Sequence, residues 1–335
     1  MTLRFGIVGC GKAAGSFAEA ISAIPEATIS VVCDADVTVA TAFAARIGAR
    51  VEPDAQSLVN ASDVDAVYAA LPHALLPKVV EQSLNAGKHM LAEKPLALSG
   101  AEARRLGALA DNKKLKLGVF FVLRRAGTVQ EARRIVQSGA IGTPRVMRLC
   151  TIVDKRLDYW GQSGHSNWRA SRQLAGGGVI FMNSIHQLDT VRYVTGLEYV
   201  AATGIVATYR APADVEDAGS ATLLLNNGSI VSLTANAHSA GATDEETIEI
   251  DGDDGRLIIP DPFSAEPLRL YRRGDARWTD IPVDRPDSYA LTVAEFIKAV
   301  KRDSSVTAGA TDAAAVVDAV MWIYEAADEL RGTRG

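Results

Sequence analysis

Three residues in this chain have side chains and settings that suit proton transfer. Lys94 follows Glu93 at the end of an apolar run, where partial desolvation lowers the pKa of a lysine toward neutrality. His186 lies on a predicted helix after Gly176-Gly177-Gly178, and Asp189 follows one turn later on the same face. A carboxylate so placed can orient an imidazole as a general acid or base. The alternatives are a solvated loop lysine and a histidine packed beneath a sheet, and the helix pattern alone favours the packed histidine.

A glycine-rich loop near the start of the chain suits the binding of a dinucleotide. The apolar strand predicted over residues 3–8 runs into Gly9 and Gly11, and an apolar helical pattern follows. Gly9 permits the tight turn, Gly11 lets the backbone approach a pyrophosphate, and the small Ala14 lets the helix pack on the strand. Free N–H groups and the helix dipole stabilise phosphates at such a helix start. The alternative is an α/β protein that turns on glycines without binding a nucleotide.

Asp34 strengthens the dinucleotide interpretation. It ends a second predicted strand about 20 residues beyond the loop, where a carboxylate accepts the ribose hydroxyls of NAD and repels a 2′-phosphate. Ala35 and Asp36 follow it, so no neighbouring arginine accepts that phosphate. We therefore predict NAD as the cofactor, with NADP less favoured. The residues predicted to bind it are Gly9, Gly11, Lys12, Ala13, Ala14, Asp34, Leu71, Pro72, His73, Glu93 and Lys94.

The elements that position these residues alternate regularly between strand and helix through the first third of the chain. Such alternation predicts a doubly wound parallel sheet, which is a Rossmann domain over residues 1–122. Ligands bind beyond the carboxyl ends of the strands in sheets of this kind. Gly9, Asp34, Pro72 and Lys94 all fall at predicted strand ends, so we expect them to line one crevice.

From residue 123 to 335 the pattern changes to helices and short β runs, two of which the turn Asn226-Asn227-Gly228 joins as a hairpin. This predicts an α+β domain on an open, mostly antiparallel sheet, which binds substrate and mediates assembly. One face of that sheet has no helix left to cover it. Burial of this face against a second copy predicts a homodimer or a homotetramer. The residues expected to include some on this face are Leu223, Leu225, Ile230 and Leu233.

Composition narrows the partners of the chain. Its 335 residues carry a formal net charge of −5 without a long basic run, which argues against nucleic acid. No apolar run approaches the roughly 18 residues of a membrane span, and no signal peptide precedes the first strand, so we expect a cytoplasmic protein that does not enter a membrane. The three cysteines and five histidines show no disulfide or zinc spacing, so no metal is expected.

The chain resembles the glucose–fructose oxidoreductase, inositol dehydrogenase and rhizopine-catabolism (Gfo/Idh/MocA) family over essentially its whole length. The resemblance rests on the glycine loop, Asp34, the run A-G-K-H-M-L-A-E-K-P over residues 86–95, and the glycine triplet followed by His186 and Asp189. It implies a Rossmann domain followed by a domain whose open sheet often forms the oligomer interface. It also implies an enzyme that transfers hydride between nicotinamide and a CH–OH group of a sugar, cyclitol or glycoside. Lys94, which matches the lysine that contacts the ribose and the substrate hydroxyl, then becomes catalytic together with His186 and Asp189.

Two departures from the family pattern matter. The family often has an aspartate four residues before the helix histidine, and this chain has Met182 there, beside Asn183. It also commonly carries an asparagine and a histidine in the strand-four loop, where His73 and Leu76 stand here. The first departure leaves Lys94 and His186 as the acid–base apparatus. It is also the sole support for an alternative, a non-catalytic NAD-binding sensor or co-regulator. A third possibility is a glycosidase-type member that uses tightly bound NAD transiently.

An aromatic and polar loop over residues 159–169 suits a small polyol or sugar. Aromatic faces cover the C–H surface of such a ring, and arginine or asparagine side chains hold its hydroxyls. The alternative is a set of half-buried structural anchors. Arg124 and Arg125 are weaker candidates, since paired arginines at a domain junction are often ion-paired surface residues. The residues predicted to bind substrate are Lys94, Tyr159, Trp168, Arg169, Asn183 and His186.

Overall fold

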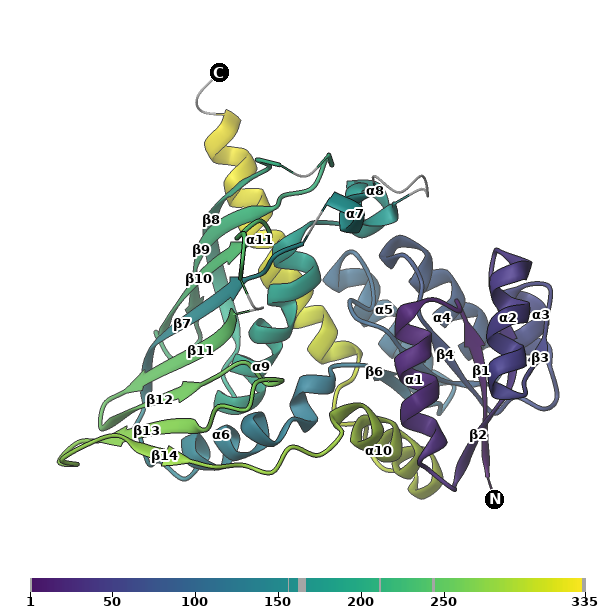
Figure 1. Ribbon diagram of the computed structural model, residues 1–335, viewed down its shortest axis with the longest axis horizontal. Helices are drawn as coiled ribbons and strands as arrows, with labels where there is room; N and C mark the ends of the chain where they lie inside the picture. Colours follow the sequence, from purple (N-terminus) through teal and green to yellow (C-terminus); the bar gives the residue numbers. More distant parts are fainter. Residues whose placement is uncertain (1, 156, 162–166, 211, 243–244, 333–335) are drawn as a thin grey trace. The chain divides into compact units, whose positions relative to one another are not determined.

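The computed structural model describes residues 2–155, 157–161, 167–210, 212–242 and 245–332, which pack as two units (Figure 1). The first continuous segment of the first unit ends at Val122, where the sequence places the domain boundary. The segment Asp287–Ala314, which the sequence assigns to the second domain, packs with the first unit instead. The first unit is Met1–Val122 with Asp287–Ala314, and the second is Leu123–Pro286 with Ala315–Gly335.

The first unit is built on a parallel sheet of six strands in the order β3-β2-β1-β4-β5-β6. This is the doubly wound order that the alternation predicts. The short strand β3 and the helix α3 were not expected from the sequence. The strands are β1 (Leu3–Val8), β2 (Ala27–Cys33), β3 (Arg50–Val51), β4 (Ala66–Ala69), β5 (His89–Ala92) and β6 (Leu117–Val119). The helices are α1 (Lys12–Ser22), α2 (Val37–Ile47), α3 (Ala55–Asn60), α4 (Leu76–Asn85), α5 (Gly100–Asn112) and α10 (Ser288–Arg302).

Helices cover both faces of this sheet, as neighbouring residues of β1 show. Consecutive strand residues point to opposite faces. The ring of Phe5 meets Phe17 of α1 at 5.4 Å and Phe296 of α10 at 6.2 Å between centroids. On the opposite face, Gly6 lies so close to Leu58 of α3 that an added Cβ would come within 2.6 Å of that side chain. The contact with Phe296 explains why the segment from Asp287 returns to the first unit, since it buries an aromatic face there.

The second unit contains a sheet of eight strands in the order β14-β13-β12-β11-β7-β10-β9-β8. Only β10 and β7 pair in parallel among its described strands, so the sheet is mostly antiparallel as predicted. The strands are β7 (Pro144–Ile152), β8 (Tyr199–Ala207), β9 (Ala218–Leu225), β10 (Ile230–Asn236), β11 (Glu245–Gly252), β12 (Gly255–Ile259), β13 (Leu268–Arg272) and β14 (Thr279–Ile281). The helices are α6 (Gly127–Gln137), α7 (Leu157–Trp160), α8 (Arg172–Ala175), α9 (Ile185–Thr195) and most of α11 (Ala310–Gly332).

Helices α9 and α11 lie on one face of this sheet, and its other face is open among the described residues (Figure 1). Of the four residues expected to include some on the open face, Ile230 is there, with 46% of its surface exposed. Leu223, Leu225 and Leu233 belong to the opposite face and are buried, so Ile230 is the member of this set that lies on the open face. Side chains alternate along a strand, and the sequence alone left the parity of β9 open.

Two further observations limit the kinds of site that the described residues contain. None of their helices combines the length and the hydropathy needed to cross a bilayer. Within the same ranges, no group of three or more histidine, cysteine, aspartate or glutamate side chains is arranged to hold a metal ion.

Candidate active site

The glycine loop adopts the geometry that a dinucleotide requires. Gly9 has a φ of 89°, and a Cβ at this position would come within 2.3 Å of the carbonyl oxygen of Ala70 and 3.1 Å of the Leu71 side chain. A residue with a side chain would therefore push β1 away from the end of β4. Gly11 is different, because a Cβ there would meet nothing within 4 Å. The space beside Gly11 is thus open for the backbone to approach a ligand.

Helix α1 begins directly after this loop with its first N–H groups available. Gly11 is the N-cap residue and has no side chain with which to cap them, and the first turn contains no acidic residue. Unsatisfied N–H groups and the positive end of the dipole favour a bound phosphate at such a helix start. The residues at this end of the sheet therefore fit the pyrophosphate of a dinucleotide.

Asp34 lies at the end of β2, where its carboxylate braces the loop. One oxygen accepts the N–H of Cys10 at 2.7 Å, and the other accepts the N–H of Asp36 at 2.9 Å. A carboxylate offers about four lone-pair sites, so each oxygen keeps acceptor capacity for a ribose hydroxyl. Cys10 and Cys33 are buried beside it, and burial raises the pKa of each thiol to about 12. Both therefore stay protonated near neutral pH and pack as small apolar groups.

Glu93 and Lys94 follow β5, and the Lys94–Pro95 peptide bond is cis. The Glu93 carboxylate accepts the hydroxyl of Tyr68 at 2.6 Å and the N–H of Lys94 at 3.2 Å. Burial raises the pKa of the Glu93 carboxyl, and the charge of Lys94 opposes that shift. Tyr68 is itself fully buried and stacks on Phe17 with 4.0 Å between ring centroids. A rigid aromatic cluster thus holds the turn that presents Lys94.

In the second unit, His186 lies on α9, which is tied to the sheet by polar side chains. The amide of Gln187 donates to the carbonyl of Cys150 on β7 at 2.8 Å and accepts the hydroxyl of Thr151 at 2.7 Å. The Ser184 hydroxyl donates to Thr151 at 2.9 Å. Such buried bonds restrict how the helix can rotate on the sheet. The helix is preceded by a π-helical turn over Ile180–Ser184, a feature that is frequent at functional sites.

Asp189 forms an ion pair that the sequence interpretation did not include. Its carboxylate accepts two bonds from the Arg124 guanidinium, at 2.8 Å from Nε and 2.6 Å from Nη2. The side chains of Arg124 and Asp189 are 5% and 1% exposed, so Arg124 is not a surface residue. This ion pair connects helix α9 with the turn that precedes helix α6. Its geometry identifies a structural role for Asp189 that spacing from His186 alone did not indicate.

Three of the residues predicted to bind substrate lie together in the second unit. The guanidinium of Arg169 packs over the rings of Tyr159 and Trp168, at 5.1 and 4.7 Å from their centroids. The hydroxyl of Tyr159 contacts the sulfur of Met182 at 3.4 Å. Burial raises the pKa of the Tyr159 phenol, with nearby Arg169 acting against the shift. Met182, which stands where the family often has aspartate, therefore has an aromatic partner. Residues 162–166 of the predicted substrate loop lie outside the described residues.

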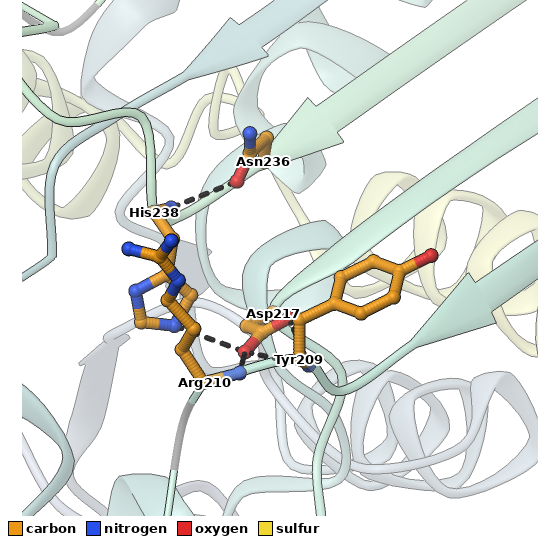
Figure 2. A pocket seen from close by; sticks show the side chains of 5 residues that line it. All are labelled: Tyr209, Arg210, Asp217, Asn236 and His238. Atoms are coloured by element: carbon orange, nitrogen blue, oxygen red, sulfur yellow. Dashed lines mark hydrogen bonds and ion pairs between the residues drawn. The ribbon is translucent and has the colours of Figure 1, made fainter.

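A hollow of about 350 Å³ lies at the end of the second sheet where β8 and β10 finish (Figure 2). The buried Asp217 carboxylate accepts the N–H groups of Tyr209 and Arg210 at 2.9 and 2.7 Å and lies 2.9 Å from His238 Nε2. Asn236, also in its lining, belongs to the residues of β10 that point away from α9. None of the five lining residues is among the predicted site residues.

Sequence reasoning missed the residues that hold the glycine triplet before α9. Glu216, which precedes β9, and Tyr324 of α11 both pack against this turn. The one available signal was Glu216-Asp217 at the start of an apolar strand, where two carboxylates need buried partners. That signal does not say which partners they have, because Gly178 and Tyr324 are distant in the chain.

Comparisons with known proteins match most of the chain. Residues 3–121 match the oxidoreductase family with an NAD-binding Rossmann fold, and residues 129–258 match the GFO/IDH/MocA C-terminal domain. The chain is 25% identical to levoglucosan dehydrogenase of Pseudarthrobacter phenanthrenivorans over 291 residues, covering 77% of this chain and 73% of that protein. It is 26% identical to inositol 2-dehydrogenase of Rhizobium meliloti over 333 residues, covering 95% and 94%. The structure of levoglucosan dehydrogenase with NADH and L-sorbose has a TM-score of 0.89 at 24% identity over 98% of both chains, a likeness of fold.

Proposed function

Because the chain belongs to the glucose–fructose oxidoreductase, inositol dehydrogenase and rhizopine-catabolism (Gfo/Idh/MocA) family of oxidoreductases, we propose that it is an NAD-dependent dehydrogenase of a sugar, cyclitol or glycoside. The observation that carries this proposal is the arrangement around Asp34. Its carboxylate braces the glycine loop through Cys10 and keeps acceptor capacity for ribose hydroxyls. The relatives named as levoglucosan dehydrogenase and inositol 2-dehydrogenase support the substrate class.

Each part of the chain has a defined task in this proposal. The loop at Gly9 and Gly11 binds the pyrophosphate, and Asp34 binds the adenosine ribose. When bound, NAD supplies the hydride acceptor. Lys94 and His186 hold and move the proton of the substrate hydroxyl as its carbon is oxidised. The remaining predicted contacts orient the ring, and they are Tyr159, Trp168, Arg169 and Asn183.

The deciding experiment is a screen of sugars, cyclitols and glycosides with NAD and with NADP. We expect absorbance of the reduced cofactor to rise with at least one polyol and NAD. Release of NADH into solution separates a dehydrogenase from a glycosidase-type enzyme that restores its bound cofactor in each cycle. Tight NAD binding without turnover on any polyol would contradict the proposal and favour the sensor or co-regulator.

The cofactor preference of the enzyme gives a first prediction. Asp34 repels a 2′-phosphate, and the neighbouring Ala35 offers no positive charge to accept one. We expect kcat/KM to be higher with NAD than with NADP, and Asp34→Ser with Ala35→Arg to move the preference toward NADP. The comparison is made on the polyol found in the screen. Equal or better use of NADP by the unaltered enzyme would contradict this prediction.

The open face of the second sheet gives a prediction about assembly. Cross-strand register places Ile230 beside Val146 on β7 and Leu224 on β9, and all three are partly exposed. The next row contains Thr222, Ser232 and Arg148, and the Arg148 guanidinium is paired with Glu249 and Asp251 of the neighbouring strand. We propose that two copies bury this face together as a homodimer, alone or within a homotetramer.

We expect Ile230→Lys to lower the mass of the assembly in light scattering, because the lysine would lose its hydration in the interface. The matched control is Val37→Lys, since Val37 is an apolar residue of α2 with 67% of its surface exposed. The control should leave the mass unchanged. A monomer mass for the unaltered protein at micromolar concentration would refute the proposed assembly.

A further inference from the structure

We propose that Glu216 and Tyr324 are positioning residues for His186, because together they hold the turn that starts its helix. This inference rests on the proposed function, in which His186 handles the substrate proton. Neither residue is among those predicted to touch cofactor or substrate. Both lie in the second unit, as does the whole helix, so the argument concerns contacts within that unit alone.

Glu216 satisfies three consecutive N–H groups at the start of the helix. Its carboxylate accepts the N–H of Gly178 at 2.7 Å and that of Ile180 at 3.1 Å. Its main-chain carbonyl accepts the N–H of Val179 at 3.1 Å. These are donors that a helix leaves without partners of its own, and a carboxylate at this end also interacts favourably with the dipole. A single residue just before β9 thus determines where the helix begins.

Tyr324 holds the carboxylate of Glu216 in place. Its hydroxyl donates to the oxygen of Glu216 that also accepts the N–H of Ile180, at 2.7 Å. Both side chains are buried, with exposed fractions of 6% for Glu216 and 4% for Tyr324. Burial raises the pKa of the Glu216 carboxyl, while the hydrogen bonds from Tyr324 and the helix N–H groups act against that rise. The Tyr324 hydroxyl and the N–H groups of Gly178 and Ile180 therefore stabilise a carboxylate that would otherwise be costly to bury.

The glycine triplet is explained by this packing. A Cβ on Gly177 would lie 2.1 Å from the Tyr324 hydroxyl, and one on Gly178 would lie 1.7 Å from the carbonyl oxygen of Glu216. Side chains at these positions would force the turn away from β9 and α11. The glycines thus let the start of the helix approach two other elements closely. Their role here is to fix the position of the start of the helix.

The contact of the glycine turn with Glu216 and Tyr324 matters because the proposed functional residues follow within two turns. Met182 and Asn183 lie in the π-helical turn, and His186 lies in the first turn of α9. The N–H of Met182 bonds to the carbonyl of Gly178 at 2.8 Å, so the position of this turn depends on the glycines. A displacement of about 1 Å in an acid–base group can cost about 10²-fold in rate. Weakening the contacts of Glu216 and Tyr324 with the start of the helix should therefore lower turnover without removing any group that touches substrate.

The test compares Tyr324→Phe with the matched control Tyr199→Phe. Tyr199 is also buried, and its hydroxyl donates to the carbonyl of Leu188 at 3.1 Å, farther along the same helix. We expect Tyr324→Phe to lower kcat on the polyol from the screen by about tenfold or more, with NADH affinity unchanged. The substrate deuterium isotope effect on kcat should rise, because a poorly placed base slows the chemical step. Tyr199→Phe should keep near-native turnover and the native isotope effect. Equal losses in the two variants would overturn the inference.

A second measurement does not depend on activity. The chain has five histidines, so ring resonances in a histidine-labelled sample are few, and His186→Asn assigns the peak of His186. We expect this peak and its titration midpoint to shift in Tyr324→Phe and to stay in place in Tyr199→Phe. An unchanged His186 peak in Tyr324→Phe would overturn the inference. If the screen finds no substrate, the proposed function fails, while this measurement still decides whether Tyr324 positions His186.

Graded replacements of Glu216 complete the test. Glu216→Gln keeps one carbonyl oxygen that can accept a helix N–H, whereas Glu216→Ala keeps none. We expect Glu216→Gln to retain more turnover than Glu216→Ala, with the His186 peak shifted less. If Glu216→Ala does not fold, Glu216→Gln and Tyr324→Phe still test the positioning role, because each weakens the hydrogen bonds at the start of the helix in a different way. Native turnover and an unshifted His186 peak in Glu216→Gln and Tyr324→Phe alike would contradict the positioning role.

Discussion

Lys94→Ala and His186→Ala should each lower kcat by roughly 10²–10⁴, the usual worth of a positioned acid–base group. The affinity for NADH should change much less, because it depends chiefly on the glycine loop and Asp34. Loss of a ribose contact by Lys94 would weaken NADH binding by about 1 kcal/mol at most. Turnover is measured on the polyol identified by the screen, and NADH affinity by its fluorescence.

The double variant tests whether the two residues act as a unit. If they do, Lys94→Ala with His186→Ala should be little slower than either single variant, because effects within a catalytic unit are not additive. Lys88 offers a matched control, since its ammonium group bonds to the carbonyls of Ala61 and Val64 in the same unit as Lys94. Lys88→Ala should keep turnover high. The proposed roles of Lys94 and His186 fail if both single variants retain near-native turnover.

Arg124→Ala and Asp189→Ala should each destabilise the second unit by about 3–5 kcal/mol, because each removes one member of a buried ion pair. The measurement is urea unfolding followed by tryptophan fluorescence. All four tryptophans lie in the second unit, at positions 160, 168, 278 and 322, so the signal reports on the unit that contains the pair. Replacing both residues with apolar ones of similar size should be far less destabilising than either single change, since both charges of the pair are then removed.

An exposed ion pair of the same unit serves as the control. Arg145 and Asp253 form two bonds at 2.9 and 2.8 Å, but their side chains are 54% and 45% exposed. Arg145→Ala should therefore lower the free energy of unfolding by less than about 1 kcal/mol. A similar cost for Arg124→Ala and Arg145→Ala would contradict the structural importance assigned to the buried pair.

The sequence by itself determined the elements whose signals are local. Helix α2 is determined by local signals, because Asp36 caps its first N–H groups and Gly48 adopts the left-handed conformation that ends it. The turn at Gly228 and the cap at Ser99 likewise depend on residues close by in the chain. The glycine loop and Asp34 were identified because their motif lies within one βαβ unit. In each case the residues that decide the structure lie within a few positions, or within one motif.

Only the tertiary structure decided which distant side chains meet. Asp189 is three residues from His186, yet its carboxylate pairs with Arg124, which lies 65 residues away in the chain. Glu216 and Tyr324 are separated by 108 residues and meet at the glycine triplet, whose pattern resembled a motif without revealing its partners. Periodicity predicts which elements form, but it does not say which buried charge will neutralise which. That choice depends on how the sheet, α9 and α11 pack, because a buried charge is tolerated only beside its partner.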